Sequence, residues 1–301
     1  MRIRRRQRPE QIARYTILEE DDANEMCYIA TGLDGLDMFI HGQNLRSNGM
    51  FTNRLTLAGR LVLIGALLAS GTASAEDQRA SLDADPNLVG WWKLDETEGI
   101  RAADSSRHER GGTLEGDASF EENSVDGKAG KALKLDGKND LLGIKGYKGV
   151  AGTRARTTMA WIKTGRPRGE IISWGKNEFG KKWVFGYVRG RIGVTPHGGY
   201  YYMNEPTHDN EWHHVAVVVA EAELPNLHDD VTLYLDGEIA EIHDIGLLDL
   251  WPIETGDELD VTIGRGFEGS LDDVRIYDRP LRAEEVKTIF QLKSNKPMEK
   301  P

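Results

Sequence analysis

The chain has 301 residues, with 38 Lys and Arg against 49 Asp and Glu, a formal net charge of −11 and a single cysteine, Cys27. A surface this acidic argues against nucleic acid and anionic membranes as partners, because both require a basic patch. One cysteine provides no disulfide framework, so the fold must depend on a hydrophobic core.

Residues 50–75 have the three parts of a secretory signal peptide. Arg54 and Arg60 give it a basic start, residues 61–69 are apolar or glycine, and Ala73-Ser74-Ala75 has the small-residue cleavage pattern. The apolar run is too short to span a bilayer, which needs about 20 apolar residues. We therefore expect a protein that is exported to the periplasm, the cell surface or the extracellular space, with no membrane insertion after cleavage. A buried core helix is the alternative for this segment.

Residues 1–49 precede this leader and show no sustained helical or strand period. The most economical explanation is that translation starts at Met50 and that 1–49 is an artefactual or disordered extension. A cytoplasmic arm ahead of a retained anchor is the alternative. After the leader we expect a short polar linker at 76–87, one domain at 88–292 and a disordered tail at 293–301.

The domain is predicted to be almost entirely β-structure. Nine short segments alternate apolar with polar residues or are rich in β-branched and aromatic residues, and Gly, Asp and Asn separate them. Arg189-Gly190 and Asp236-Gly237 are two-residue hairpin signals. Only 282–292 has a helical period. The pattern predicts a β-sandwich or barrel with one late helix. The predicted strands are 90–96, 131–137, 157–164, 170–175, 182–188, 211–220, 230–237, 259–264 and 270–278.

Six motifs in this order resemble the laminin-G-like domains of the concanavalin A-like superfamily, in their bacterial exported form. They are GWWKLDE with ADSSRHERGGTL, GKALKLDGKNDLLGI, TTMAWIKT, NEWHHVAVVV, VTLYLDGE and GRGFEGSLDDVRIYDRPLRAEEV. The resemblance covers about residues 88–292. It implies an all-β, two-sheet antiparallel β-sandwich jelly roll with one short C-terminal helix. It says little about function, because this fold hosts lectins, adhesion modules, structural domains and hydrolases.

Glycoside hydrolases of this superfamily carry Glu-x-Asp-x-Glu on one strand, where alternation places all three carboxylates on one face. The nearest approach here is Glu258-Leu259-Asp260-Val261-Thr262, in which threonine replaces the third carboxylate. No catalytic residue is therefore predicted. His213 and His214 are neighbours in a predicted strand and point to opposite faces, so we expect structural roles for them and no shared metal ion.

Calcium is the cofactor that this fold class often carries, and it takes about 6–8 oxygen ligands. Asp104 and Asp272 are predicted to hold a structural calcium ion. Asp136, Asn139 and Asp140 form an alternative calcium loop. Alternation predicts that Asp272 faces the core, where a carboxylate is costly unless a cation or hydrogen-bond donors satisfy it. Hydrogen bonds from a loop are the alternative to calcium at this position.

Aromatic side chains suited to stacking on sugars are the remaining signal. Tyr200, Tyr201 and Tyr202 are consecutive and cannot all be buried on one face of a strand, Trp251 lies in an apparent loop, and Trp183 lies on a predicted strand. We therefore predict a non-catalytic recognition module that binds carbohydrate at the cell surface or in the periplasm. The alternatives are a structural or adhesion domain that binds a cell-surface protein, and a glycoside hydrolase whose carboxylates the sequence does not reveal.

Overall fold

The computed structural model describes residues 15–17, 26–31, 37–42, 75–244 and 251–294. The chain divides into two compact units, residues 1–68 and 69–301. In the first unit, strands β1 (Tyr15–Ile17), β2 (Met26–Thr31) and β3 (Asp37–Gly42) form a three-stranded antiparallel sheet in that order. Most of the predicted leader lies outside the described residues, so it stays a prediction.

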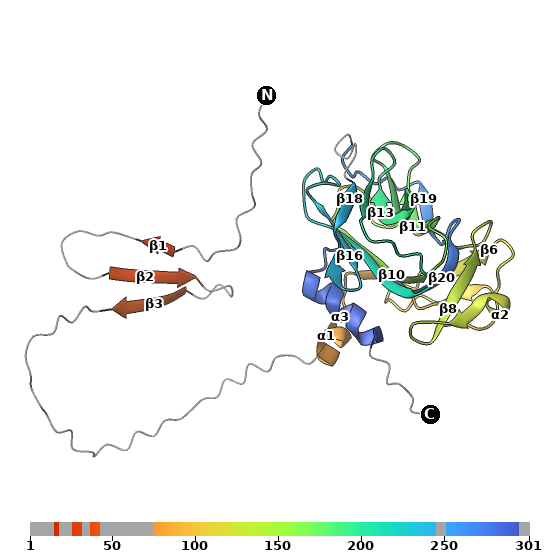
Figure 1. Cartoon of the computed structure of the whole chain (residues 1–301), viewed down its shortest axis with the longest axis horizontal. Coiled ribbons are helices and arrows are strands. Elements are labelled where there is room, and N and C mark those ends of the chain that lie inside the picture. Colours follow the sequence, from red (N-terminus) through yellow and green to blue (C-terminus); the bar gives the residue numbers. More distant parts are fainter. Residues whose placement is uncertain (1–14, 18–25, 32–36, 43–74, 245–250, 295–301) are drawn as a thin grey trace, which may run out of the picture. The chain divides into compact units, whose positions relative to one another are not determined.

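Two antiparallel sheets make up the second unit (Figure 1). The first has eight strands in the order β17-β16-β15-β10-β20-β8-β7, and β4 also pairs with β20. Its long central strands β10, β15 and β20 carry most of its pairing. The strands are β4 (Leu88–Trp92), β7 (Ser124–Asp126), β8 (Lys131–Asp136), β10 (Arg156–Lys163), β15 (Trp212–Val219), β16 (Val231–Leu235), β17 (Glu238–Ile239) and β20 (Glu268–Tyr277).

The second sheet has nine strands in the order β18-β14-β13-β12-β11-β19-β9-β6-β5. Sequence neighbours such as β11, β12 and β13 pair directly, whereas β19 returns late in the chain to lie between β11 and β9. The strands are β5 (Arg101–Ala102), β6 (Gly112–Glu115), β9 (Leu141–Ile144), β11 (Glu170–Gly175), β12 (Lys182–Val188), β13 (Arg191–Thr195), β14 (Tyr201–Met203), β18 (Ile242–Asp244) and β19 (Leu259–Ile263).

All nine predicted strands overlap strands of the structure, and the two-sheet antiparallel sandwich is confirmed. Both predicted hairpin turns have left-handed backbone at their two central residues. The φ angles are 51° and 82° at Arg189-Gly190 and 50° and 81° at Asp236-Gly237, as a two-residue turn of type I′ requires. The sequence analysis missed several strands of two to four residues, because so few residues show no period. It also missed β2 and β3, of six residues each, in the segment 1–49 that was expected to be artefactual or disordered.

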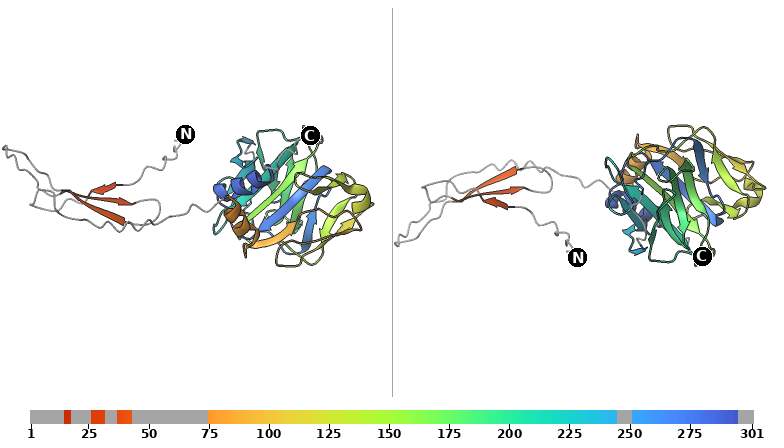
Figure 2. Two further views of the ribbon diagram at one scale, coloured as in Figure 1. Left: turned by 90° about the horizontal axis from the view of Figure 1, so that it is seen from below. Right: turned by 90° about the horizontal axis from the view of Figure 1, so that it is seen from above.

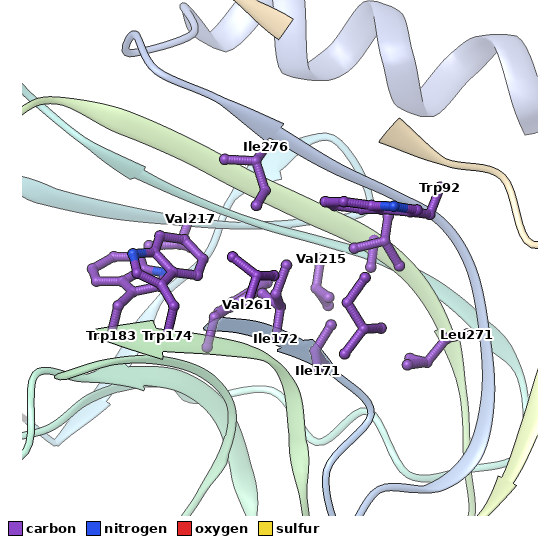
Figure 3. Packing of buried hydrophobic residues seen from close by; sticks show 14 of the residues in the cluster. Trp92, Ile171, Ile172, Trp174, Trp183, Val215, Val217, Val261, Leu271 and Ile276 are labelled. Atoms are coloured by element: carbon purple, nitrogen blue, oxygen red, sulfur yellow. The ribbon is translucent and has the colours of Figure 1, made fainter. Parts of the chain in front are cut away.

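The hydrophobic core lies between the two sheets (Figure 3). Trp92, Val215 and Ile276 reach it from the eight-stranded sheet, and Trp174 and Trp183 reach it from the nine-stranded sheet. The ring centroids of Trp174 and Trp183 are 5.9 Å apart, and both side chains are fully buried. Aromatic side chains of this size dominate the energetics of a core, so the interface between the sheets stabilises the fold.

A second, smaller apolar cluster lies on the outer face of the eight-stranded sheet. Figure 2 shows the helices that cover this face. Helices α1 (Ala75–Asp83) and α3 (Ala283–Ser294) contact each other there, and Leu82 of α1 is buried in the same cluster as Trp91 and Tyr277. The predicted linker at 76–87 is therefore wrong. Among the α1 residues whose burial is described, Leu82 is the one buried apolar residue, and only docking on α3 reveals that it belongs to the core. A short helix α2 (Phe120–Asn123) was also not predicted.

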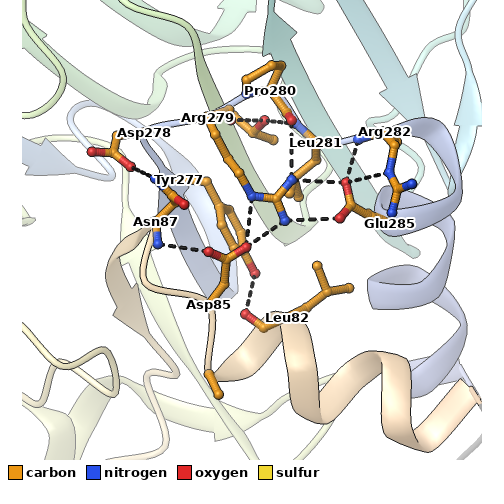
Figure 4. Close-up of polar contacts among 12 residues, drawn as sticks. Leu82, Asp85, Asn87, Tyr277, Asp278, Arg279, Pro280, Leu281, Arg282 and Glu285 are labelled. Atoms are coloured by element: carbon orange, nitrogen blue, oxygen red, sulfur yellow. Dashed lines mark hydrogen bonds and ion pairs between the residues drawn. The ribbon is translucent and has the colours of Figure 1, made fainter. Parts of the chain in front are cut away.

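Polar contacts fasten the segment after α1 to the end of β20 (Figure 4). Asp85 accepts hydrogen bonds from Nε and Nη2 of Arg279, and Glu285 of α3 binds the same guanidinium. Asn87 donates to the carboxylate of Asp278 at 2.9 Å. Within the described part of the chain, no helix is both long and apolar enough to cross a membrane.

Candidate ligand-binding site

Two exposed aromatic rings stack on each other beside the nine-stranded sheet. Phe179, in the turn between β11 and β12, is 58% exposed, and Trp251 is 43% exposed. Their ring centroids are 5.5 Å apart with the planes within 13° of parallel, and the His197 ring lies 5.1 Å from Phe179. Single exposed apolar residues are ordinary, but an exposed stacked pair presents a continuous apolar surface. Such a surface can stack on the apolar face of a sugar ring.

Backbone hydrogen bonds join the three segments that carry these rings. Gly180 donates to the carbonyl of His197 at 3.0 Å, and Glu254 donates to the carbonyl of Gly180 at 2.9 Å. Gly198 has a φ of 112°, and a Cβ added there would lie 2.5 Å from Phe179 and 2.9 Å from Trp251. Only glycine fits at this position, so the backbone is closely packed against the two rings.

Arg156 fixes the segment that follows Trp251. Its buried guanidinium donates to the carbonyls of Val150, Gly152 and Arg154 and, at 2.8 Å, to the hydroxyl of Thr255. Desolvation lowers the pKa of Arg156 to about 9, so the side chain is still charged at neutral pH. The guanidinium thus links the 150–154 loop to the chain four residues after Trp251, which helps to position the exposed ring.

A hollow of about 340 Å³ opens on the outer face of the nine-stranded sheet, next to the same turn. In β19, Val261 and Ile263 belong to the core, so the alternating residues Asp260 and Thr262 point outward. The turn that carries Phe179 also supplies Asn177 to this hollow, which connects the hollow with the aromatic pair. The lining residues are Ser173, Trp174, Asn177, Lys182, Leu259, Asp260, Thr262 and Arg265.

The floor of the hollow is polar and internally hydrogen-bonded. The hydroxyl of Ser173 donates to Glu170 and lies 3.0 Å from the hydroxyl of Thr262. Lys182 and Arg265 approach Glu170 at 3.8 and 3.7 Å. Hydroxyls, a carboxylate and cations in this arrangement offer both donors and acceptors, which are the groups that fix the orientation of a polar ligand.

The two carboxylates of the incomplete glycosidase pattern are both paired with lysines. Lys176 lies 2.6 Å from Glu258, and Lys148 lies 2.8 Å from Asp260. The hydrogen bond from Lys148 lowers the pKa of Asp260 below its usual range. Asp260 is therefore ionised at neutral pH and is not set up as a general acid, which needs a raised pKa.

The five aromatic residues predicted to bind a ligand differ in how far they are buried. Trp183 is fully buried, so its assignment as a ligand-binding residue is wrong; its position in the β12 alternation faces the core. Tyr201 joins the core, whereas Tyr202 lies on the opposite face of β14, 4% exposed and 5.6 Å from the His243 ring. Tyr200 is half-buried beneath the guanidinium of Arg189. Trp251 alone among these five is exposed, at 43%.

The two carboxylates predicted to hold a structural calcium ion, Asp104 and Asp272, accept hydrogen bonds from protein donors. Asp104 accepts hydrogen bonds from the amides of Trp91, Ser106 and Arg110 and from the hydroxyl of Ser106, at 2.8 to 2.9 Å. These four donors match the roughly four lone-pair positions of a carboxylate. Oδ2 of Asp272 accepts the amides of Lys128 and Ala129 at 2.8 and 3.2 Å.

The predicted core-facing position of Asp272 is wrong. Leu271 and Val274 belong to the core, because a bulge at Asp273, with a φ of 52°, interrupts the alternation of β20. Asp272 instead pairs with Trp161 of β10, which stacks on Phe290 of α3. The amides of Lys128 and Ala129 donate to its carboxylate. Hydrogen bonds from a loop were the alternative to calcium at this position.

The alternative calcium loop is also held by local contacts. Asp136 accepts the amide of Lys138 at 2.8 Å, Asn139 donates to Asp117, and Asp140 accepts the amide of Asp117. Among the residues that the structure describes, no group of three or more His, Cys, Asp or Glu side chains is arranged to hold a metal ion. Calcium binding stays a prediction.

The two adjacent histidines have separate surroundings, as their alternation predicts. The imidazole of His213 lies between two carboxylates, with Nδ1 2.9 Å from Asp236 and Nε2 3.2 Å from Asp209. The hydrogen bond with Asp236 is the main cause of a raised pKa at His213. His214 is 1% exposed, and its ring lies 5.2 Å from Trp161.

Sequence reasoning missed Phe179 and Asn177. The one available signal was an aromatic residue in the polar turn Lys176-Asn177-Glu178-Phe179-Gly180, between two strands. An apolar ring in a tight hairpin turn cannot reach the core of a two-sheet sandwich. It must therefore contact another loop or stay exposed.

Two facing antiparallel sheets define a jelly-roll β-sandwich. The sequence profile of the concanavalin A-like lectin/glucanases superfamily matches residues 136–287, about half of the chain. The chain belongs to this superfamily, as its motifs indicated. No curated protein matches it.

Similar solved structures include three toxin binding domains. The binding domain of Paraclostridial Mosquitocidal Protein 1 has a TM-score of 0.47 and 17% identity, over 69% of this chain and 53% of that one. The Botulinum neurotoxin serotype D binding domain has a TM-score of 0.42 and 12% identity, over 72% of this chain and 53% of that one. The binding domain of Botulinum neurotoxin DC, in complex with rat synaptotagmin II, has a TM-score of 0.44 and 12% identity, over 69% of this chain and 52% of that one. The chain thus spans about half the length of these structures.

Proposed function

We propose that this protein is an exported, non-catalytic recognition module that binds carbohydrate at the cell surface, in the periplasm or outside the cell. The observation that carries the proposal is the exposed stacked pair of Phe179 and Trp251, beside a polar hollow. In this proposal the apolar face of a sugar ring packs on the aromatic pair. Its hydroxyls then exchange hydrogen bonds with Asn177, Asp260 and Arg265. The leader-like segment at 50–75 supports export.

The test measures binding of the full chain to an array of neutral oligosaccharides, followed by calorimetric titration of the best ligand. Trp251→Ala and Phe179→Ala should each weaken binding by about 30-fold, the effect of removing an aromatic anchor worth about 2 kcal/mol. Ile239→Ala is the matched control, because Ile239 is also apolar and 65% exposed but lies on the other sheet. It should bind like the unmodified chain.

Two other outcomes would each reject the proposal. If no oligosaccharide binds and a purified surface protein binds through the same aromatic pair, the module is an adhesion domain. If bound oligosaccharides are cleaved, it is a hydrolase. Export has its own test: N-terminal sequencing of the secreted product should begin at Glu76. A secreted peptide from residues 1–49 would contradict the assignment of the leader.

A further inference from the structure

A larger hollow, of about 820 Å³, lies on the outer face of the eight-stranded sheet. Its volume falls within the roughly 300–1,000 Å³ of small-molecule sites. Strands β8, β10 and β20 form its floor, and the loop after β10 forms one wall. The lining residues are Val125, Asp126, Lys134, Leu135, Asp136, Lys163, Thr164, Gly165, Arg166, Asn210, Glu268, Gly269 and Ser270.

Two lysines and a serine form a row across this floor. Ser270 of β20 pairs directly with Lys163 of β10 on one side and with Lys134 of β8 on the other. Neighbouring strands are about 4.8 Å apart, so the two lysine backbones are about 10 Å apart. Flexible stems of four methylene groups allow both ammonium groups to reach one ligand above Ser270.

Three cations and three carboxylates line the hollow, but the two lysines on its floor are not paired with those carboxylates. Each carboxylate in its lining already has a cation from outside the lining. Within the described part of the chain, neither Lys134 nor Lys163 has a carboxylate at ion-pair distance. The pairs of the lining carboxylates are Asp126 with Lys131, Asp136 with Lys138 and Glu268 with Arg168. Two like charges held side by side without a counter-ion are a site for an anion.

A third cation is held in place by an ordered loop. The Thr164 hydroxyl accepts the amide of Arg166 at 2.9 Å and donates to the carbonyl of Glu268. Asn210 donates its amide to the carbonyl of Thr164 at 3.0 Å. The Arg166 guanidinium approaches Glu268 at 3.6 Å, and Glu268 is shared with Arg168. The loop therefore needs little reordering to present Arg166, which lowers the entropic cost of binding.

We propose that this hollow binds a saccharide that carries a carboxylate or a sulfate group. Lys134, Lys163 and Arg166 bind the anionic group, since charge-assisted hydrogen bonds are the stronger kind. The space is larger than a single inorganic ion needs, and Ser270 and Asn210 offer hydroxyl and amide partners for sugar hydroxyls. The site lies on the opposite sheet from the aromatic pair, so it does not depend on the function proposed above.

The experiment is a calorimetric titration of the full chain with three probes at low ionic strength. They are a trigalacturonate, which carries carboxylates alone, a κ-carrageenan tetrasaccharide, which carries sulfates alone, and sodium sulfate. We expect one or both oligosaccharides to bind, and binding to weaken as salt is added. The oligosaccharide that binds more tightly identifies carboxylate or sulfate as the preferred group. Binding of sodium sulfate as tight as that of the oligosaccharides would overturn the saccharide assignment.

Matched variants place the binding in this hollow. Lys134→Ala and Lys163→Ala should each weaken binding by about tenfold, the loss of one charged hydrogen bond. Lys163→Arg should retain most of the affinity. Lys287→Ala removes the same charge from α3 and should bind like the unmodified chain, as should Trp251→Ala. Melting curves confirm that each variant is folded. Unchanged binding in the double variant of Lys134 and Lys163, or no binding of either oligosaccharide to the unmodified chain, would overturn the proposal.

Discussion

Replacement of Asp85 by alanine tests whether the segment around α1 is part of the domain. The Asp85 carboxylate is 10% exposed and accepts two hydrogen bonds from Arg279, whose side chain is 25% exposed (Figure 4). It also accepts the amide of Asn87 at 2.8 Å. The substitution removes all three contacts and leaves Arg279 with the carboxylate of Glu285 and the carbonyl of Pro280.

The expected loss in the free energy of unfolding is about 3 kcal/mol. Removal of one partner from a buried ion pair costs about 3–5 kcal/mol, because the other charge stays buried. Glu285 still neutralises Arg279 after the substitution, so the lower end of this range applies. A pair on the protein surface is worth about 0–1 kcal/mol.

Urea unfolding of the full chain measures this difference. Asp126→Ala is the matched control, because Asp126 also pairs with a cation, Lys131 at 2.9 Å, but is 95% exposed. It should lose less than about 1 kcal/mol. Limited proteolysis of Asp85→Ala should also show faster cleavage before β4. Equal stability losses in Asp85→Ala and Asp126→Ala would refute the conclusion that this segment is a buried part of the domain.

Three further predictions concern pH, the aromatic pair and calcium. The pKa of His213 is raised in the folded state, so its contribution to stability is complete below its unfolded value near 6.5 and is lost as the pH rises through the folded value. The stability gap between the unmodified chain and His213→Gln, measured by urea unfolding, should therefore be larger at pH 5 than at pH 8; a constant gap would contradict this. Gly198→Ala should weaken oligosaccharide binding in the calorimetric titration of the neutral oligosaccharide, because its methyl group would overlap both rings of the aromatic pair, and unchanged affinity would show that those rings do not bind sugar. Thermal melting with and without a chelator should give the same midpoint, since backbone donors already occupy Asp104 and Asp272; a lower midpoint with the chelator would establish a structural calcium ion.

The strands were predictable because their determinants are local. In β12 and β15, apolar residues alternate or cluster between turn residues, and a chain with this pattern buries one face of each strand whatever its neighbours are. The turn at Asp236-Gly237 was predictable for the same reason, because few residues adopt left-handed backbone at two successive positions. Boundaries of short strands such as β5 and β18 depend on pairing with distant segments, and they were not predictable.

The candidate sites depend on contacts between residues far apart in the chain. Trp251 and Trp183 are both aromatic residues in a β-rich sequence, and only the sheet positions decide that one is 43% exposed and the other fully buried. The bulge at Asp273 changed the face on which Asp272 lies, and no sequence signal marked that bulge.

By itself, the sequence determined the fold class, the superfamily and two hairpin turns, because hydrophobic alternation and turn chemistry act over a few neighbouring residues. The tertiary structure alone decided that Phe179 stacks on Trp251 and that Lys163, Ser270 and Lys134 form a row. It also decided that α1 is part of the domain. These features arise from strand register and helix docking, which bring together segments that no local pattern connects.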